Sequence, residues 1–167
     1  MTMASSWSYV PGDIYKPAGT IIHYLVDIVA KGGNYLLNVG PSPLGDYYTV
    51  AYSRMKEIGA WMKVNGDAIY NSRPIAPYKE KNICFTQNKD KSVNAIYLAS
   101  KEETTLPPVI LIKGIKPAKN SIIKLHGEKK NMKWKTENGE TLIYIPSSVQ
   151  KIPPCKYAWT FTITQVE

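Results

Sequence analysis

Four aspartates in the N-terminal part of the chain are the first candidates for acid–base chemistry: Asp13, Asp27, Asp46 and Asp67. Hydrolysis by paired carboxylates needs two of them facing one substrate. Asp13 precedes a predicted helix and suits a cap, and Asp27 falls inside that helix. Asp46 lies in a loop after a predicted strand, where barrel enzymes place functional groups. Because none has a partner at a convincing position, the residues alone indicate no catalytic site.

The histidines and cysteines also form no reactive group. His23 falls on the polar side of a predicted helix, so we expect a surface residue, and His126 precedes a glycine in a predicted turn. Cys84 and Cys155 lie too far apart in sequence for a metal motif. A disulfide would require an oxidising compartment, and two free, partly buried thiols are the favoured interpretation. We therefore expect no metal and no cofactor.

The charge of the chain carries little information about partners. The formal net charge is +8, but the basic residues are scattered lysines with only two arginines, Arg54 and Arg73. Nucleic-acid sites rely on clustered charge and on arginine forks, so we expect a lysine-rich surface and no nucleic-acid partner. No stretch reaches the ~20 apolar residues of a membrane span. Residues 1–9 also lack the basic and apolar regions of a signal peptide.

The elements that would position these residues change in character along the chain. Residues 17–31 predict an amphipathic helix that starts at Pro17, and residues 49–64 predict a second one. Between them, residues 35–39 form a short apolar run that predicts a buried strand. Helix, strand and helix indicate α/β architecture with a parallel sheet. A buried parallel strand needs neighbours on both sides, so we expect that Met1 is not the natural start of this fold.

After Pro74 the pattern is that of short strands separated by turns. The last run alternates, with Trp159, Phe161 and Ile163 on one face and threonines on the other. Asn138-Gly139 is a hairpin signal between two runs. Such spacing indicates an antiparallel β-sandwich, and roughly 90 residues suffice for independent folding. The predicted strands span residues 83–87, 93–99, 109–113, 121–125, 132–135, 141–145 and 157–165.

The sequence resembles the family 29 α-L-fucosidases over essentially its whole length. Residues 25–45 read LVDIVAKGGNYLLNVGPSPLG and are similar to the family's LVDxVSKGGNLLLNVGPxxDG. IGAW, NGDAIY and RP, within residues 58–74, resemble IGxW…NGEAIYxTRP, and SSWSY at residues 5–9 resembles SWGY. YAWT at residues 157–160 resembles the end of the family's C-terminal domain. Ser8 and Leu44 depart from the family's Gly and Asp, and Leu44 puts a polar role for its loop position in doubt.

The resemblance implies a placement for each part of the chain. Residues 1–73 would be the C-terminal remnant of a (β/α)₈ catalytic barrel of the TIM type, with its last strand and last helices. Residues 74–167 would be the C-terminal β-sandwich domain. The family's reaction is retaining hydrolysis of terminal α-L-fucose by an aspartate nucleophile and a second carboxylate as acid/base. Both precede the SWGY-like segment in the family, so we expect this chain alone to be inactive.

The resemblance also implies one substrate contact, a substrate class and a location. Trp7 matches the family's aromatic residue near the C6 methyl of fucose, and the alternative role is packing at the barrel rim. The partner of the intact enzyme would be a fucosylated glycan, in a secreted, periplasmic or lysosomal protein, and a homo-oligomer is compatible with the sequence. A different reading is a carbohydrate-binding or interaction module on the sandwich. Trp134 is its best candidate contact, although an inward-facing strand residue is the favoured interpretation of Trp134.

Overall fold

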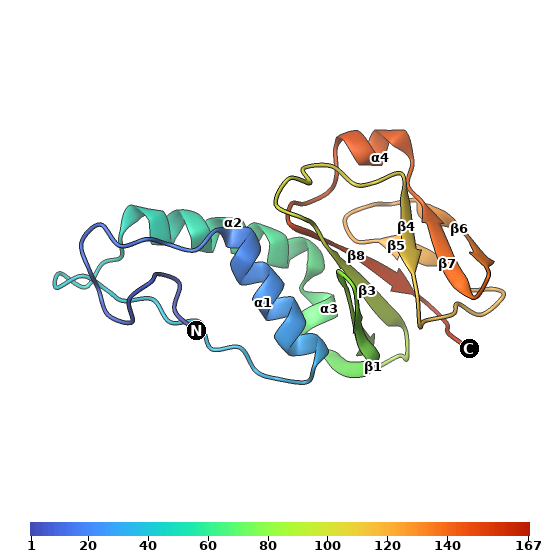
Figure 1. The fold of residues 1–167 in the computed structure, drawn as a ribbon, viewed down its shortest axis with the longest axis horizontal. Helices are drawn as coiled ribbons and strands as arrows, with labels where there is room; N and C mark the ends of the chain where they lie inside the picture. Colours follow the sequence, from blue (N-terminus) through green and yellow to red (C-terminus); the bar gives the residue numbers. More distant parts are fainter.

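The computed structural model describes residues 1–167 and contains two regions side by side (Figure 1). Loops and three helices lie at the N-terminal side, and β-strands form the other side. The helices are α1 (Ala18–Ala30), α2 (Thr49–Asn65) and the short α3 (Asp67–Tyr70). The two long ones confirm the helices predicted over 17–31 and 49–64. No helix is long and apolar enough to cross a membrane.

The apolar run at residues 35–39 differs from its prediction as a buried strand. Its only ladder contact is one parallel bridge, between Asn38 and Thr2. The Met3 N–H donates to the Asn38 carbonyl at 2.8 Å, and the Asn38 N–H donates to the Met1 carbonyl at 2.9 Å. Leu36 is 82% exposed. One extended neighbour, in place of two, is too little to build a parallel strand that is covered on both faces.

The strands pair antiparallel throughout and confirm the seven predicted runs. They form one eight-stranded sheet in the order β1-β2-β3-β8-β5-β6-β7-β4. Asn138 and Gly139 both adopt positive φ, as a two-residue hairpin between β6 and β7 requires. The bounds are β1 (Ser72–Glu80), β2 (Ile83–Asn88), β3 (Val93–Leu98), β4 (Val109–Ile112), β5 (Ile123–Leu125), β6 (Asn131–Glu137), β7 (Glu140–Tyr144) and β8 (Ala158–Ile163), with helix α4 (Ser147–Lys151) before β8.

The expected sandwich is a single sheet that curls over one core. β6 makes the connection, since its first residues pair with β5 and its later residues pair with β7. A strand that passes from one half to the other closes the corner between them. Trp159, Phe161 and Ile163 point into this core and are fully buried, as their alternation predicts. The core cluster holds eighteen buried residues, drawn from both halves of the curled sheet and the loops between strands.

A second core joins the helices to the outer face of β2, β3 and β8. It contains ten buried residues, among them Trp61 of α2 and Ile96 of β3. The Trp61 indole N–H donates to the Ala158 carbonyl at 2.9 Å. Cys84 lies in this core as a free thiol, and Cys155, also free, packs against it. Residues 1–71 and 72–167 therefore share buried surface.

Candidate functional site

Trp7 lies in the N-terminal loop, held beside the segment that contains Asn38. Its side chain is 77% exposed. Its carbonyl accepts a hydrogen bond from Asn38 Nδ2 at 2.8 Å. The backbone bonds on either side of Asn38 already fix the loop to residues 1–3. The structure thus places an open indole at the end of two parallel extended segments.

Gly40 allows the two segments to approach closely. A Cβ at this position would lie 2.6 Å from the Tyr9 nitrogen and 2.7 Å from the Ser8 carbonyl carbon. Backbone atoms cannot move aside cheaply, so no other residue fits without displacing the loop. The two segments line a hollow of about 250 Å³ made by residues 7–9 and 38–41. Trp7 and Gly40 are therefore parts of one small site.

Three neighbouring tyrosine rings pack beside this hollow. Tyr9 lines it and lies 6.5 Å, centroid to centroid, from Tyr48. Tyr48 in turn stacks on Tyr15 at 6.4 Å with an interplanar angle of 11°. These rings give the site an aromatic support with hydroxyl groups attached. Sequence reasoning missed Asn38, Gly40 and the tyrosines as neighbours of Trp7. The NVGP motif and the many tyrosines were the available signals.

The candidate carboxylates have separate, structural partners. Asp13 accepts hydrogen bonds from the Ser6 N–H at 2.8 Å and the Ile14 N–H at 2.7 Å. The Ser6 bond is the main reason that the pKa of Asp13 is lowered. Asp13 therefore fixes the loop that carries Trp7. Asp46 accepts from the Ser42 hydroxyl in its own turn.

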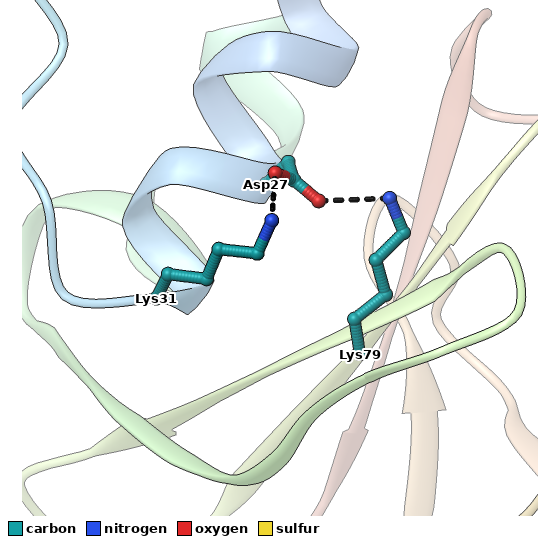
Figure 2. Close-up of polar contacts among 3 residues, drawn as sticks. All are labelled: Asp27, Lys31 and Lys79. Carbon is teal, nitrogen blue, oxygen red and sulfur yellow. Dashed lines mark hydrogen bonds and ion pairs between the residues drawn. The ribbon is translucent and has the colours of Figure 1, made fainter.

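Asp27 and Asp67 complete the set and also face no second carboxylate. Asp27 binds Lys31 at 2.5 Å and Lys79 at 2.8 Å (Figure 2). Burial pushes the pKa of Asp27 upward, but the hydrogen bonds from the two lysines outweigh it and lower the pKa. Asp67 begins α3. No three His, Cys, Asp or Glu side chains gather as a group that could hold a metal ion.

The histidines serve structural contacts. His23 was expected on the surface, but it is partly buried and its Nε2 lies 2.8 Å from the Tyr157 carbonyl. A carbonyl only accepts, so Nε2 carries the proton. His126 lies in the predicted turn. Its Nδ1 faces the Val64 carbonyl at 3.2 Å, and its Nε2 faces the Thr162 hydroxyl at 2.7 Å. Burial lowers the pKa of His126.

Comparisons with known proteins identify the family of this chain. Residues 1–67 match the family described as alpha-L-fucosidase, and residues 77–164 match the alpha-L-fucosidase C-terminal domain. The chain belongs to the alpha-L-fucosidase family. Tissue alpha-L-fucosidase of Bos taurus is 36% identical over 150 residues, which is 89% of this chain and 31% of that protein. The Mus musculus tissue enzyme is 32% identical over 97% of this chain and 36% of its own length.

Solved fucosidase structures share the fold. Alpha-fucosidase of Thermotoga maritima, bound to a mechanism-based inhibitor, superposes with a TM-score of 0.84 at 21% identity. The superposition covers 98% of this chain and 38% of the Thermotoga maritima chain. Alpha-L-fucosidase isoenzyme 1 of Paenibacillus thiaminolyticus gives a TM-score of 0.80 at 25% identity, over 100% of this chain and 39% of its own. The chain therefore spans about a third of the curated relatives that it matches.

Proposed function

We propose that this chain is the C-terminal portion of a retaining α-L-fucosidase that removes terminal α-L-fucose from glycans. Membership of the fucosidase family across both parts of the chain carries this proposal. The chemistry of retaining glycosidases requires two carboxyl groups about 5 Å apart. Asp13, Asp27 and Asp46 are each bound to other groups. The chain alone is therefore proposed to be inactive, with the catalytic pair outside these 167 residues.

We propose that residues 1–73 are the end of a (β/α)₈ barrel and residues 74–167 the C-terminal β-sandwich domain. The parallel bridge between Thr2 and Asn38 supports the first part, because α1 connects the two bridged segments. An extended segment, a helix and a parallel extended segment are the repeating unit of such barrels. α2 follows in the position of the next outer helix. The curled antiparallel sheet supports the second part.

Trp7 is proposed to contact fucose in the intact enzyme. Fucose is a 6-deoxy sugar, so its methyl group needs an apolar wall, and the open indole beside the hollow suits this role. Burial of one methyl contributes on the order of 1 kcal/mol. The contact would therefore favour fucose over a sugar with a hydroxyl at C6. A packing role for Trp7 is less well supported, because most of the side chain lies open.

Hydrolysis of an aryl α-L-fucoside by the purified chain tests the first proposal. We expect no turnover above buffer, since the covalent step has no nucleophile here. The Asp13→Asn, Asp46→Asn double variant serves as the matched control. Turnover that the chain shows and this variant loses would place catalytic carboxylates within these residues.

A longer protein that contains this chain tests the role of Trp7. Trp7→Ala should weaken fucose binding and narrow the preference over galactose analogues, with little change in melting temperature. Trp7→Phe should retain much of the preference, because the apolar wall persists. A large loss of stability with unaltered sugar preference would assign Trp7 to packing instead.

The alternative function, a carbohydrate-binding face centred on Trp134, gains no support from the position of that residue. Trp134 is partly buried and packs against the core of the sheet. Its indole N–H donates to the Ser121 carbonyl at 3.1 Å. A ring fixed in this way offers no open platform for a sugar, as the inward-facing interpretation predicts.

A further inference from the structure

A second and larger cleft lies between α1 and the sheet. Its volume is about 1070 Å³, just above the usual range for small-molecule sites. One wall is α1, and the other is made by Lys79 of β1, the end of β3 with the loop that follows it, and the segment that leads into β8. The residues of this second wall are Lys79, Leu98, Ala99, Ser100, Lys101, Glu103, Thr104, Lys156, Tyr157 and Trp159. No residue lines both this cleft and the hollow beside Trp7. It is therefore a separate place at which a ligand could bind.

The α1 wall is a single polar stripe. Thr20, His23, Tyr24 and Asp27 line the cleft and recur at helical spacing, and Lys31 follows directly after the helix. From residue 20 to residue 30 the helix rises about 15 Å. Tyr24 lines the cleft and is 47% exposed, so part of its side chain is accessible to a ligand. The stripe offers hydroxyl groups, an imidazole and an aromatic surface along the length of the cleft.

Tyr157, on the opposite wall, is held in an uncommon conformation. Its φ is +74°, in the left-handed region that non-glycine residues seldom adopt. His23 donates to its carbonyl, and its hydroxyl donates to Glu57. A Cβ added to Gly19 would lie only 2.8 Å from the Tyr157 ring, so a glycine at this position leaves space for the ring. Backbone strain of this kind is often kept where a residue must present its side chain in one place.

The charges of the cleft leave an excess of cations. Its lining holds four lysines and two carboxylates. Lys31 and Lys79 neutralise Asp27 (Figure 2). Glu103 accepts from the Tyr97 hydroxyl at 2.7 Å and from the Ser100 N–H at 2.6 Å, so both its oxygens are occupied. Lys101 and Lys156 take part in no salt bridge, and Lys156 contributes only a minor part of the lowering of the Glu57 pKa, whose main cause is the hydrogen bond from Tyr157.

We propose that this cleft binds an acidic oligosaccharide, with a sugar ring on Tyr24 and the anionic substituent near Lys101 and Lys156. The hydroxyls of Ser100 and Thr104 would serve the sugar hydroxyl groups. No arginine lines the cleft, so the anionic group would be bound by the lysine ammonium groups as point charges. Carboxylate and sulfate are the two anionic substituents that the test below compares. This binding goes beyond fucose hydrolysis and does not depend on the site at Trp7.

Titration of the ¹⁵N-labelled chain followed by NMR tests the proposal. The probes are 3′-sialyllactose for a carboxylate, 3′-sulfolactose for a sulfate, and lactose as the neutral control, and none of them contains fucose. We expect an acidic probe to shift the amide signals of residues 20–31 and 98–104 and to bind at least about tenfold more tightly than lactose. Two cation–anion contacts at partly exposed sites are worth about this factor. The probe that binds more tightly identifies the anion.

Variants separate this cleft from general attraction to a basic protein. Lys101→Glu with Lys156→Glu should weaken the acidic probe about tenfold or more, and Tyr24→Ala should weaken both the acidic probe and lactose. Lys119→Glu changes a lysine of the same kind at an exposed position, next to Ala118, whose N–H donates to the Gln165 carbonyl beyond the C-terminal end of β8. This variant should leave affinity within about twofold. Equal binding of all three probes, or equal loss in the Lys119 variant, would overturn the proposal. Neither result would bear on fucosidase function.

Discussion

The N-terminal loops and the curled sheet differ in how many apolar side chains they bury. The sheet encloses eighteen buried core residues. The cluster under the N-terminal loops holds three, Met3, Ile21 and Ala51. Ile14, Leu36 and Leu44 are 76%, 82% and 91% exposed there. The N-terminal region is thus organised by backbone hydrogen bonds and close approaches, while the sheet is organised by its interior.

The helices stand between these extremes because they share a core with the sheet. α1, α2 and α3 place their apolar faces on β2, β3 and β8. This shared core includes a buried hydrogen bond, from the Trp61 indole N–H to the Ala158 carbonyl. The strand pattern after Pro74 predicts a domain that is large enough to fold alone. The shared core divides the chain differently, with weak loops on one side and helices joined to the sheet on the other.

The largest effect is expected in the core of the sheet. Phe161 is fully buried on the central strand β8. Phe161→Ala should lower the free energy of unfolding by about 3–5 kcal/mol, measured by urea denaturation with circular dichroism. Trp7→Ala removes a larger but exposed ring and should change it by less than about 0.5 kcal/mol. Similar losses in both variants would contradict the comparison between the two regions.

A substitution in the core that the helices share with the sheet should have an intermediate effect on stability. Trp61→Phe keeps most of the apolar surface but leaves the buried Ala158 carbonyl with the weak thiol donor of Cys155 in place of the indole N–H. We expect a loss of about 1–3 kcal/mol in unfolding free energy. Limited proteolysis should then cut residues 66–72 earlier than in the parent chain. If the cutting pattern stays the same while stability falls, the helices are held by contacts other than this bond.

Gly40 allows the loops themselves to be perturbed. Gly40→Ala places a Cβ against the backbone of residues 8 and 9, so the Trp7 loop must shift. We expect a loss of about 1–3 kcal/mol and a change in tryptophan emission. Gly59→Ala is the matched control, because Gly59 is a helix residue with nothing within 4 Å of an added Cβ. It should stabilise the chain by about 0.5–1 kcal/mol, and equal behaviour of the two variants would rule out the close approach.

The smallest effect is a dependence of stability on pH through His126. Burial lowers its pKa in the folded chain below the ordinary value near 6.5. The unfolded chain therefore takes up a proton first as pH falls, and the contribution of His126 to stability is lost as pH drops from about 6.5 through the folded pKa. The slope of unfolding free energy between pH 7 and pH 5 should decrease in His126→Gln. His23→Gln is the control. A larger decrease of the slope in His23→Gln than in His126→Gln would show that His126 does not cause it.

The burial pattern explains which elements sequence reasoning could find. Alternation gave the faces of β8, and helical periodicity gave α1 and α2, because each buries one face. β1 was missed because Pro74 and Pro77 interrupt it, which an edge strand tolerates. Residues 35–39 were predicted as a strand because they are apolar, but an apolar run does not show whether the chain supplies strands to pair with it. Within residues 1–167 the only ladder contact of this run is the bridge between Asn38 and Thr2.

The small site was harder to predict because it depends on contacts between distant segments. Trp7 could be singled out only through the resemblance. Its neighbours Asn38 and Gly40 lie more than thirty positions away, and no local pattern joins them. His23 was placed on the surface because its helix face is polar, but the approach of Tyr157 covers it. The periodicity of one helix does not show which residues from a later part of the sequence will pack against it.

The strand order has a consequence for the time course of synthesis. β8 is the last strand of the sheet in sequence, yet it lies between β3 and β5. A nascent chain leaves the ribosome at about 5–20 residues per second, with its N-terminal end first. Until residue 163 has emerged, β3 has an open edge and the helices lack the strand that carries Ala158. Because both cores contain residues of β8, we expect both to be completed only after this strand has been synthesised.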